Sequence, residues 1–174
     1  WIDGGGRVDA TFEHVFADGS RASGMSLLML AMVHDHEGLA EALLRRGADV
    51  SLQKSDGGTA LTLAAANGRE KLVELALRHG AEINQRRRTT GGTALMSAAY
   101  KGHERIVDTL IRHGADIDQG YSNGSTALMQ AAANGRERVV DTLIRHGAQI
   151  DLQNHGGDTA LIQAAHFGHP TVVR

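Results

Sequence analysis

The sequence contains no cysteine and one proline among its 174 residues, and only 3% of the residues are aromatic. Without cysteine the chain has no disulfide framework, no thiolate nucleophile and no cysteine-based zinc site. No apolar run approaches the roughly 18 residues that a transmembrane helix requires. The first six residues lack the basic region and apolar core of a signal peptide, so we expect an intracellular, cytoplasmic protein.

The charge also lacks a dominant sign, since 18 Lys and Arg stand against 20 Asp and Glu. A general binder of nucleic acid or of acidic membranes carries a basic surplus, so the charge argues against both. Glycine is the abundant residue, at 22 of 174 or about 13%, against roughly 7% in an average protein. Because 41% of the residues are hydrophobic, the chain can still bury a core.

Short segments of the sequence recur at a nearly fixed interval. Thr-Ala-Leu begins at residues 59, 93, 126 and 159, and Gly-Ala begins at residues 47, 80, 114 and 147. The steps are 33 or 34 residues, and the segment 108–115 returns unchanged as 141–148. Repeats of this length are typical of proteins built from stacked structural units.

Each unit predicts two short helices. In one unit, Thr59 is the expected N-cap of a helix over 60–66, which Asn67-Gly68 should end. A second helix is expected over 70–79, and Gly80 should stop it in the left-handed conformation that helix ends favour.

Such short helices are marginal in water, so each must bury its apolar stripe against the next unit. Pairs of small side chains should let the first helices approach closely: Ala64 and Ala65, Ala98 and Ala99, Ala131 and Ala132, and Ala164 and Ala165. The sequence therefore predicts an all-α solenoid of stacked helix-turn-helix units with hairpin-like loops.

This pattern resembles the ankyrin repeat, a unit of 33 residues. The matching residues of one unit are Gly58 to Leu61, Ala64-Ala65, Gly68, Leu72-Val73, Leu77 and Gly80 to Asn84. The resemblance implies a single ankyrin-repeat domain over 1–174. Its expected parts are the tail of an earlier repeat with a long loop (1–20), four full repeats (21–53, 54–87, 88–120 and 121–153) and a truncated repeat (154–174). Neither end resembles a polar cap, so we expect an excerpt of a longer array.

The chain departs from the family pattern at three positions of the unit. The family's Pro is replaced by Leu27, Ala60, Ala94, Ala127 and Ala160. The family's His is replaced by Met29, Thr62, Met96, Met129 and Ile162, so we expect its hydrogen bonds to be lost and apolar contacts to be gained. The Asp that opens the turn is replaced by Arg21, Lys54, Arg88, Tyr121 and Asn154.

Two loops are longer than their counterparts. One extra residue lies near Arg86-Arg87-Arg88, and the first loop holds about nine extra residues, including Phe12 and Phe16. The arginine run has two interpretations. It is either a solvated loop tip or a docking point for an acidic peptide or a phosphate, because a guanidinium group binds such anions through two parallel hydrogen bonds.

Ten histidines raise the question of a metal site. Six of them recur at two positions of the unit, which favours structural roles: His36, His103 and His169, and His79, His113 and His146. His34 and His36 would lie on different faces of a helix, and His166 with His169 is a poor zinc candidate. The glycine-rich tracts match no phosphate-binding loop, and no hydrolase motif is present. We expect no catalytic residue, no metal and no cofactor.

Protein binding remains as the function that the resemblance implies. Ankyrin repeats contact partners mainly through hairpin tips and the exposed face of the first helix, which indicates a non-catalytic interaction or scaffold module using its tips and concave helix face. The matching residues are Ser55, Asp56, Asn67, Arg86, Arg87, Thr89, Tyr100, Lys101, Asn123, Asn134, His155, Asp158, His166 and Phe167. Tyr100 and Phe167 are the strongest candidates because aromatic side chains supply large contact areas. Packing between repeats is the alternative for both.

The expected partner is another protein, not nucleic acid or a membrane, and the chain is expected to be a monomer. The alternative function is a regulatory or spacer segment of a larger multidomain protein whose catalytic part lies outside this chain. Binding that depends on the tips would separate these two hypotheses.

Overall fold

The computed structural model describes residues 7–16, 19 and 21–173. The elements in chain order are β1 (Thr11–Val15), β2 (Arg21–Ser26), α1 (Leu27–Val33), α2 (Glu37–Arg45), α3 (Ala60–Ala66), α4 (Glu70–Arg78), α5 (Ala94–Lys101), α6 (Glu104–Arg112), α7 (Ala127–Ala133), α8 (Glu137–Arg145), α9 (Ala160–His166) and the 3₁₀ helix η1 (Pro170–Val173). The expected tail of an earlier repeat falls partly on residues 1–6, which lie outside the described residues.

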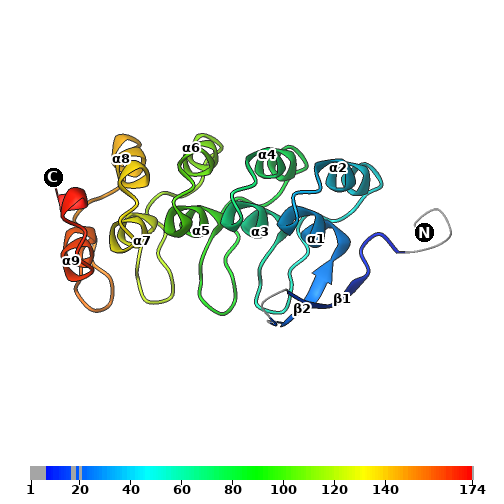
Figure 1. Ribbon diagram of the computed structural model, residues 1–174, viewed down its shortest axis with the longest axis horizontal. Coiled ribbons are helices and arrows are strands. Elements are labelled where there is room, and N and C mark those ends of the chain that lie inside the picture. The colour runs from blue at the N-terminus through cyan, green and yellow to red at the C-terminus, as the bar shows by residue number, and fades with distance from the viewer. Residues whose placement is uncertain (1–6, 17–18, 20, 174) are drawn as a thin grey trace.

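The helices form two parallel rows (Figure 1). The first helices α1, α3, α5, α7 and α9 make one row, and the second helices α2, α4, α6 and α8 make the other. Four loops, here called the tips, project from the row of first helices on the side away from the second helices (Figure 1): residues 54–58, 87–92, 121–125 and 154–158. This arrangement confirms the predicted solenoid of helix-turn-helix units.

Each first helix begins at a hydroxyl side chain. Thr59 Oγ1 accepts a hydrogen bond from the Thr62 N–H at 3.3 Å, which confirms the predicted N-cap. Ser26, Thr93, Thr126 and Thr159 cap the other first helices in the same way. The expected loss of hydrogen bonds at Thr62 is wrong, because its hydroxyl lies close enough to accept from the Thr59 N–H at 2.8 Å. At Met96 only a sulfur atom, a weak acceptor, faces the equivalent amide.

The second helices have a common charge pattern, with Glu in the first turn and Arg in the last. These charges complement the helix dipole. The helix α4 ends at Arg78, one residue earlier than predicted, and Gly80 follows with φ +83°, the left-handed conformation expected at this position. No helix in the described part of the chain combines the length and hydrophobicity needed to cross a membrane.

The core lies between neighbouring units. The expected small side chains Ala64, Ala65, Ala98, Ala99, Ala131, Ala132 and Ala164 are all 0% exposed. Ala165 is the exception and is exposed, because within the described residues α9 has another first helix on one side only (Figure 1). The close approach of the first helices is therefore confirmed for the units that have neighbours on both sides.

The long first loop forms an antiparallel hairpin, which the sequence did not predict. Strands β1 and β2 pair with Phe12 opposite Met25 and an irregularity between Phe12 and His14. Phe12 and Phe16 pack against a small cluster of buried side chains that includes Met25 and Met29. Both Phe residues of the extra segment therefore stabilise the hairpin on the first helices.

Candidate protein-binding face

The tips are tight turns closed by backbone hydrogen bonds. In each tip the first N–H donates to the last carbonyl at 2.9 to 3.0 Å: Lys54 to Gly58, Arg87 to Gly92, Tyr121 to Ser125, and Asn154 to Asp158. The prediction that Arg88 opens the second turn is wrong by one residue. Arg87 opens it, because the extra residue of this unit lies inside the tip and not before it.

Neighbouring tips are also joined to one another. The N–H of one tip donates to a carbonyl of the preceding one at 2.9 to 3.0 Å: Ser55 to Ser23, Arg88 to Asp56, Ser122 to Thr90, and His155 to Asn123. Since Ser23 belongs to β2, the hairpin is the first member of this row. The row presents backbone that is already ordered, which lowers the entropy cost of binding a partner.

The expected partner-binding residues lie on the tips, beside the 87–92 tip, or at the C-terminal ends of first helices. Most of them are exposed: Ser55, Asn67, Arg86, Thr89, Tyr100, Lys101, Asn123, His155, His166 and Phe167. Four are half-buried, namely Asp56, Arg87, Asn134 and Asp158. The structure brings the tip residues into one continuous edge.

Several of these side chains make hydrogen bonds that serve the fold. The Asn67 and Asn134 amides each donate to the carbonyl four residues earlier at 2.8 Å, at the ends of α3 and α7. Asn123 Oδ1 accepts from the Ser125 N–H at 3.0 Å, and Asp158 accepts from the Gln163 amide at 2.7 Å. A partner that bound these groups would compete with those bonds.

Asp56 joins two tips through its carboxylate. It accepts from the Gly58 N–H at 2.8 Å and lies 2.5 Å from Lys54 Nζ and 3.9 Å from Arg87 Nη1. Burial raises the pKa of Asp56, but the hydrogen bonds from Lys54 and Gly58 and the charges of Lys54 and Arg87 together hold it below its ordinary value. Asp56 and Arg87 therefore form an internal contact between tips.

The three consecutive arginines have separate environments. Arg87 is half-buried beside Asp56, and Arg88 Nε donates to the Gln53 side chain at 3.3 Å. Arg86 is exposed, and its guanidinium lies against the 87–92 tip. A Cβ atom added to Gly91 would be 2.6 Å from Arg86 Nη2 and 2.8 Å from Ser122 Oγ. The interpretation as a uniformly solvated loop does not fit Arg87, while the docking interpretation remains a prediction for Arg86.

A hollow of about 460 Å³ opens between two tips and the first helices α5 and α7. It is lined by Thr90, Tyr100, Tyr121, Ser122, Asn123 and Gln130, and we call it the tyrosine hollow. Tyr100 is 43% exposed, whereas the Tyr121 ring packs so closely over Gly92 that a Cβ there would lie 2.6 Å from Tyr121 Cε1. Burial raises the pKa of the Tyr121 hydroxyl, and nearby Arg87 opposes this only in part. Gln130 was not among the expected residues, because nothing in its own unit marks it.

Phe167 and His166 lie on the last described unit, two units away from Tyr100. Phe167 is 55% exposed at the end of α9, and its ring forms a T-shaped contact with the His166 ring, with 4.9 Å between the centroids. The two aromatic residues favoured by the sequence therefore belong to separate parts of the face.

Two of the recurring histidines reach backbone carbonyls of the preceding unit. His103 Nε2 lies 3.3 Å from the Ala66 carbonyl, and His169 Nε2 lies 3.1 Å from the Ala133 carbonyl, so each ring reaches the first helix of the preceding unit. The helix α1 ends before His34 and His36, so the expectation that they lie on different faces of a helix does not apply. Their rings stack with 6.1 Å between the centroids. Among the described residues, no three His, Asp or Glu side chains are placed to share a metal ion.

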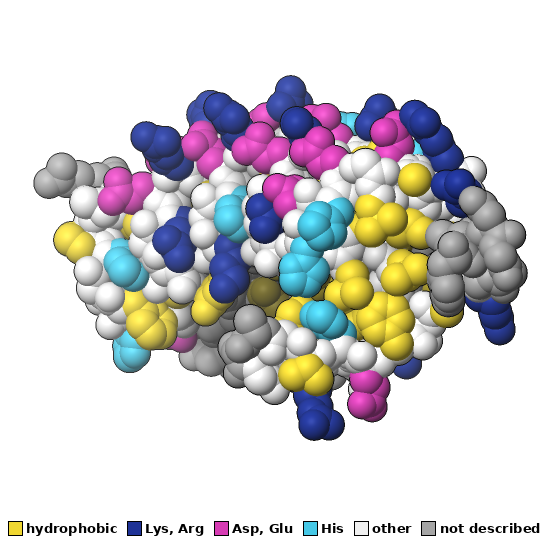
Figure 2. Space-filling view, turned by 45° about the vertical axis from the view of Figure 1, so that its right-hand side comes forward, with side chains coloured by type: hydrophobic (Ala, Val, Ile, Leu, Met, Phe, Trp, Pro, Cys, Tyr) yellow, Lys and Arg dark blue, Asp and Glu magenta, His cyan; other side chains and the backbone are white. Residues whose placement is uncertain are grey.

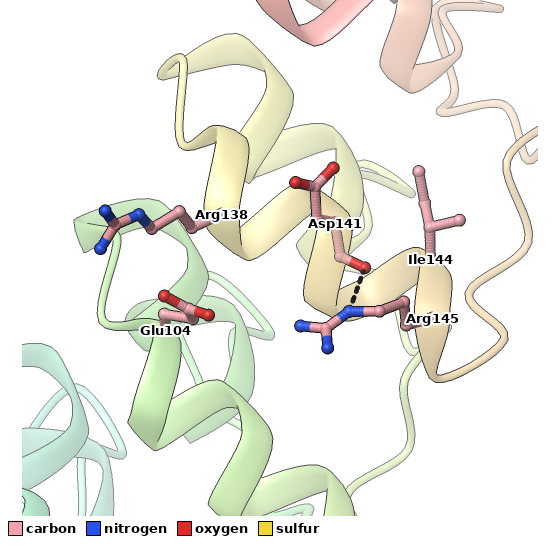
Figure 3. A pocket seen from close by; sticks show the side chains of 5 residues that line it. All are labelled: Glu104, Arg138, Asp141, Ile144 and Arg145. Atoms are coloured by element: carbon pink, nitrogen blue, oxygen red, sulfur yellow. Dashed lines mark hydrogen bonds between the residues drawn. The ribbon is translucent and has the colours of Figure 1, made fainter.

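The second helices present a surface of mixed charge. Figure 2 shows Lys and Arg interspersed with Asp and Glu along this edge. A hollow of about 510 Å³ there is lined by Glu104, Arg138, Asp141, Ile144 and Arg145. Figure 3 shows that these side chains point in different directions, and Arg145 Nε donates to the backbone of its own helix at 3.4 Å. Charges of both signs spread over an open surface are typical of a solvated helix face.

The fold and its tips define a repeat protein in which helix pairs are joined by a row of ordered turns. A family model described as ankyrin repeats, in three copies, matches residues 27–121 and 115–174. The chain therefore belongs to the ankyrin repeat family, whose members are generally modules for interaction between proteins. No curated protein matches the sequence.

Proposed function

We propose that this chain is a non-catalytic module that binds another protein through its tips and the exposed ends of its first helices. The observation that carries the proposal is the row of hydrogen bonds from tip to tip. This row holds side chains that differ from unit to unit on a backbone that needs little further ordering. The second helices support the same choice of face, because they repeat one pattern of mixed charge.

The proposed contact residues divide into two groups by environment. Exposed side chains would touch the partner directly: Ser55, Arg86, Thr89, Tyr100, Lys101, His155, His166 and Phe167. Side chains that bond within the fold would act mainly by holding the tips or the ends of first helices in place: Asp56, Asn67, Arg87, Asn123, Asn134 and Asp158. The chain would act as a monomer, since one copy supplies the whole row.

Affinity capture with the whole chain, followed by measured binding of each captured protein, tests this proposal. We expect Tyr100→Ala, Arg86→Gln or Phe167→Ala to weaken binding by about tenfold or more, as is usual for anchor residues that a partner buries at the centre of an interface. Arg105→Gln is the matched control, because Arg105 is an exposed cation on the second helix α6. Binding that responds only to changes on second helices would show that the wrong face was chosen. A chain that retains no protein would favour the spacer alternative.

A further inference from the structure

The tyrosine hollow differs from the equivalent places in the neighbouring units. Tyr100 and Tyr121 are the two tyrosines of the chain, and both line this one hollow. The units on either side carry Ala66 and Ala133 at the position of Tyr100. The repeat scaffold therefore does not require an aromatic residue there, and its lining is particular to this unit.

The segments that surround the hollow are strongly cationic. Residues 86–92, 100–101 and 121–125 contain three Arg and one Lys but no Asp or Glu, in a chain whose net charge is −2. On the preceding tip, the Asp56 carboxylate is already paired with Lys54 and Arg87. The local surplus of positive charge favours an anionic partner at this place.

Two of the cations lie close to residues that line the hollow. The Arg86 guanidinium lies against the tip beside Ser122, which lines the hollow. Lys101 Nζ lies 5.4 Å from the centroid of the Tyr100 ring. One cation thus lies beside the tip that lines the hollow, and the other lies beside the Tyr100 ring at the end of α5.

The walls of the hollow are held in place before anything binds. The Ser122 N–H donates to the Thr90 carbonyl at 3.0 Å, which joins the two tips, and the Tyr121 N–H closes its own turn. Arg136 Nε donates to the Tyr100 carbonyl at 3.2 Å and fixes the end of α5. A hollow of about 460 Å³ with such walls is large enough for a bulky side chain.

We infer that the tyrosine hollow receives an acidic segment of a partner protein. One aromatic or large apolar side chain of that segment packs between Tyr100 and Tyr121, and flanking carboxylates pair with Arg86 and Lys101. A cationic guest is disfavoured, since Lys101 already occupies the neighbourhood of the Tyr100 ring. The inference rests on the proposed function, because it names the kind of partner that the same face binds.

Synthetic peptides provide the probe. A fluorescein-labelled peptide of about 12 residues, with one central Phe among Asp and Glu, is compared with two relatives. One relative carries Asn and Gln in place of the acids, and the other carries Ser in place of Phe. We expect the first peptide to bind the whole chain about tenfold or more tightly than either relative, as measured by fluorescence polarisation.

The chain itself supplies mild substitutions for the site. Tyr100→Ala, Arg86→Gln and Lys101→Asn each install a residue that another unit has at that position, namely Ala66, Gln53 and Asn67, so the fold should tolerate them. We expect each to weaken binding of the acidic Phe peptide by about fivefold or more. Arg105→Gln removes one positive charge from α6, away from the hollow, and should change the affinity by less than about twofold.

The two tyrosines allow the binding place to be observed directly. With ¹³C-labelled tyrosine the chain gives ring signals from Tyr100 and Tyr121 only, and both should shift as the acidic peptide is added. Equal binding of the acidic and neutral peptides, or unmoved ring signals at saturation, would overturn the inference. Tighter binding of a single-stranded oligouridylate would also overturn it, because stacked bases and phosphates would then be the guest.

The same variants separate this inference from the broader proposal. A captured protein that depends on Phe167 or on the other tips, but not on Tyr100 and Arg86, would leave the protein-binding face intact and refute the acidic segment. If binding of the captured protein were unaffected by every substitution on the tips and first helices, both the proposed function and the inference would be refuted.

Discussion

Equivalent residues of the central units and the last described unit have different environments. Leu61, Leu95 and Leu128 are 1%, 1% and 3% exposed, whereas Leu161, in the same Thr-Ala-Leu segment, is 55% exposed. The local sequence is the same, so burial comes from the unit that packs on the other side. Most of the stabilising free energy of such a solenoid therefore lies in contacts between units.

Truncating the central and the last leucine tests this difference most strongly. Leu95→Ala removes a fully buried side chain and should lower the free energy of unfolding by about 3 kcal/mol. Leu161→Ala removes a side chain that is already half in water and should cost less than about 1 kcal/mol. Guanidinium unfolding followed by circular dichroism measures both, and equal losses would show that burial does not follow the stacking.

Glycines at one position of the tip give the next comparison. Gly57 and Gly157 have φ of +86° and +84°, so alanine is strained at either. At Gly57 the added Cβ would also lie 2.5 Å from the Arg88 backbone nitrogen, while nothing lies within 4 Å at Gly157. We expect Gly57→Ala to cost about 2–3 kcal/mol and Gly157→Ala about 1 kcal/mol in thermal unfolding. A similar loss in both would mean that neighbouring tips separate easily.

The contact between tips also predicts a dependence on pH. The pKa of Asp56 is lowered by its neighbours in the folded chain, so its contribution is present above its ordinary pKa of 3.8 and is lost as the pH falls through the folded value. Asp56→Asn should therefore cost about 1 kcal/mol at neutral pH and almost nothing in strong acid. The last tip carries Gly156 at this position, so it has no carboxylate there to stabilise it at neutral pH. A cost that stayed constant with pH would show that the carboxylate charge is unimportant.

The sequence predicted those features that depend on residues close together in the chain. The Thr59 cap and the Gly80 stop are local, and repetition made them visible. The tyrosine hollow could not be predicted, because Tyr100 and Tyr121 line the same hollow only when two tips and two first helices pack side by side. The turn that opens at Arg87 was misplaced by one residue, since only its backbone hydrogen bonds show where the extra residue lies.

The N-terminal hairpin could not be predicted from the sequence either, because it also depends on contacts between residues that are distant in the chain. Its strands are fixed by pairing with each other and by packing of Phe12 and Phe16 against the buried cluster that includes Met25 and Met29, not by a strong alternation of apolar residues. Ser23 then accepts a hydrogen bond from the Ser55 N–H, so the hairpin continues the row of tips. Strands that are ordered by packing against residues later in the chain leave little local signal in the sequence.

The smallest expected effect concerns the first unit, where an aspartate replaces a glycine of the repeat. Asp35 has φ +61° at the position held by Gly68, Gly102, Gly135 and Gly168 in the other units. Its carboxylate lies 3.1 Å from Arg69 Nη1, and its side chain is 45% exposed. Asp35→Gly relieves the backbone strain but removes an exposed ion pair, two effects of about 0.5–1 kcal/mol with opposite signs.

We therefore expect Asp35→Gly to change the free energy of unfolding by less than about 0.5 kcal/mol. Asp35→Ala keeps the strain and loses the ion pair, so it should be less stable than Asp35→Gly by about 1 kcal/mol. Both are measured in the same guanidinium titration. If the two variants lost equal stability, the pairing with Arg69 would govern this turn, and the first unit would differ from the central ones in its electrostatics and not in its backbone.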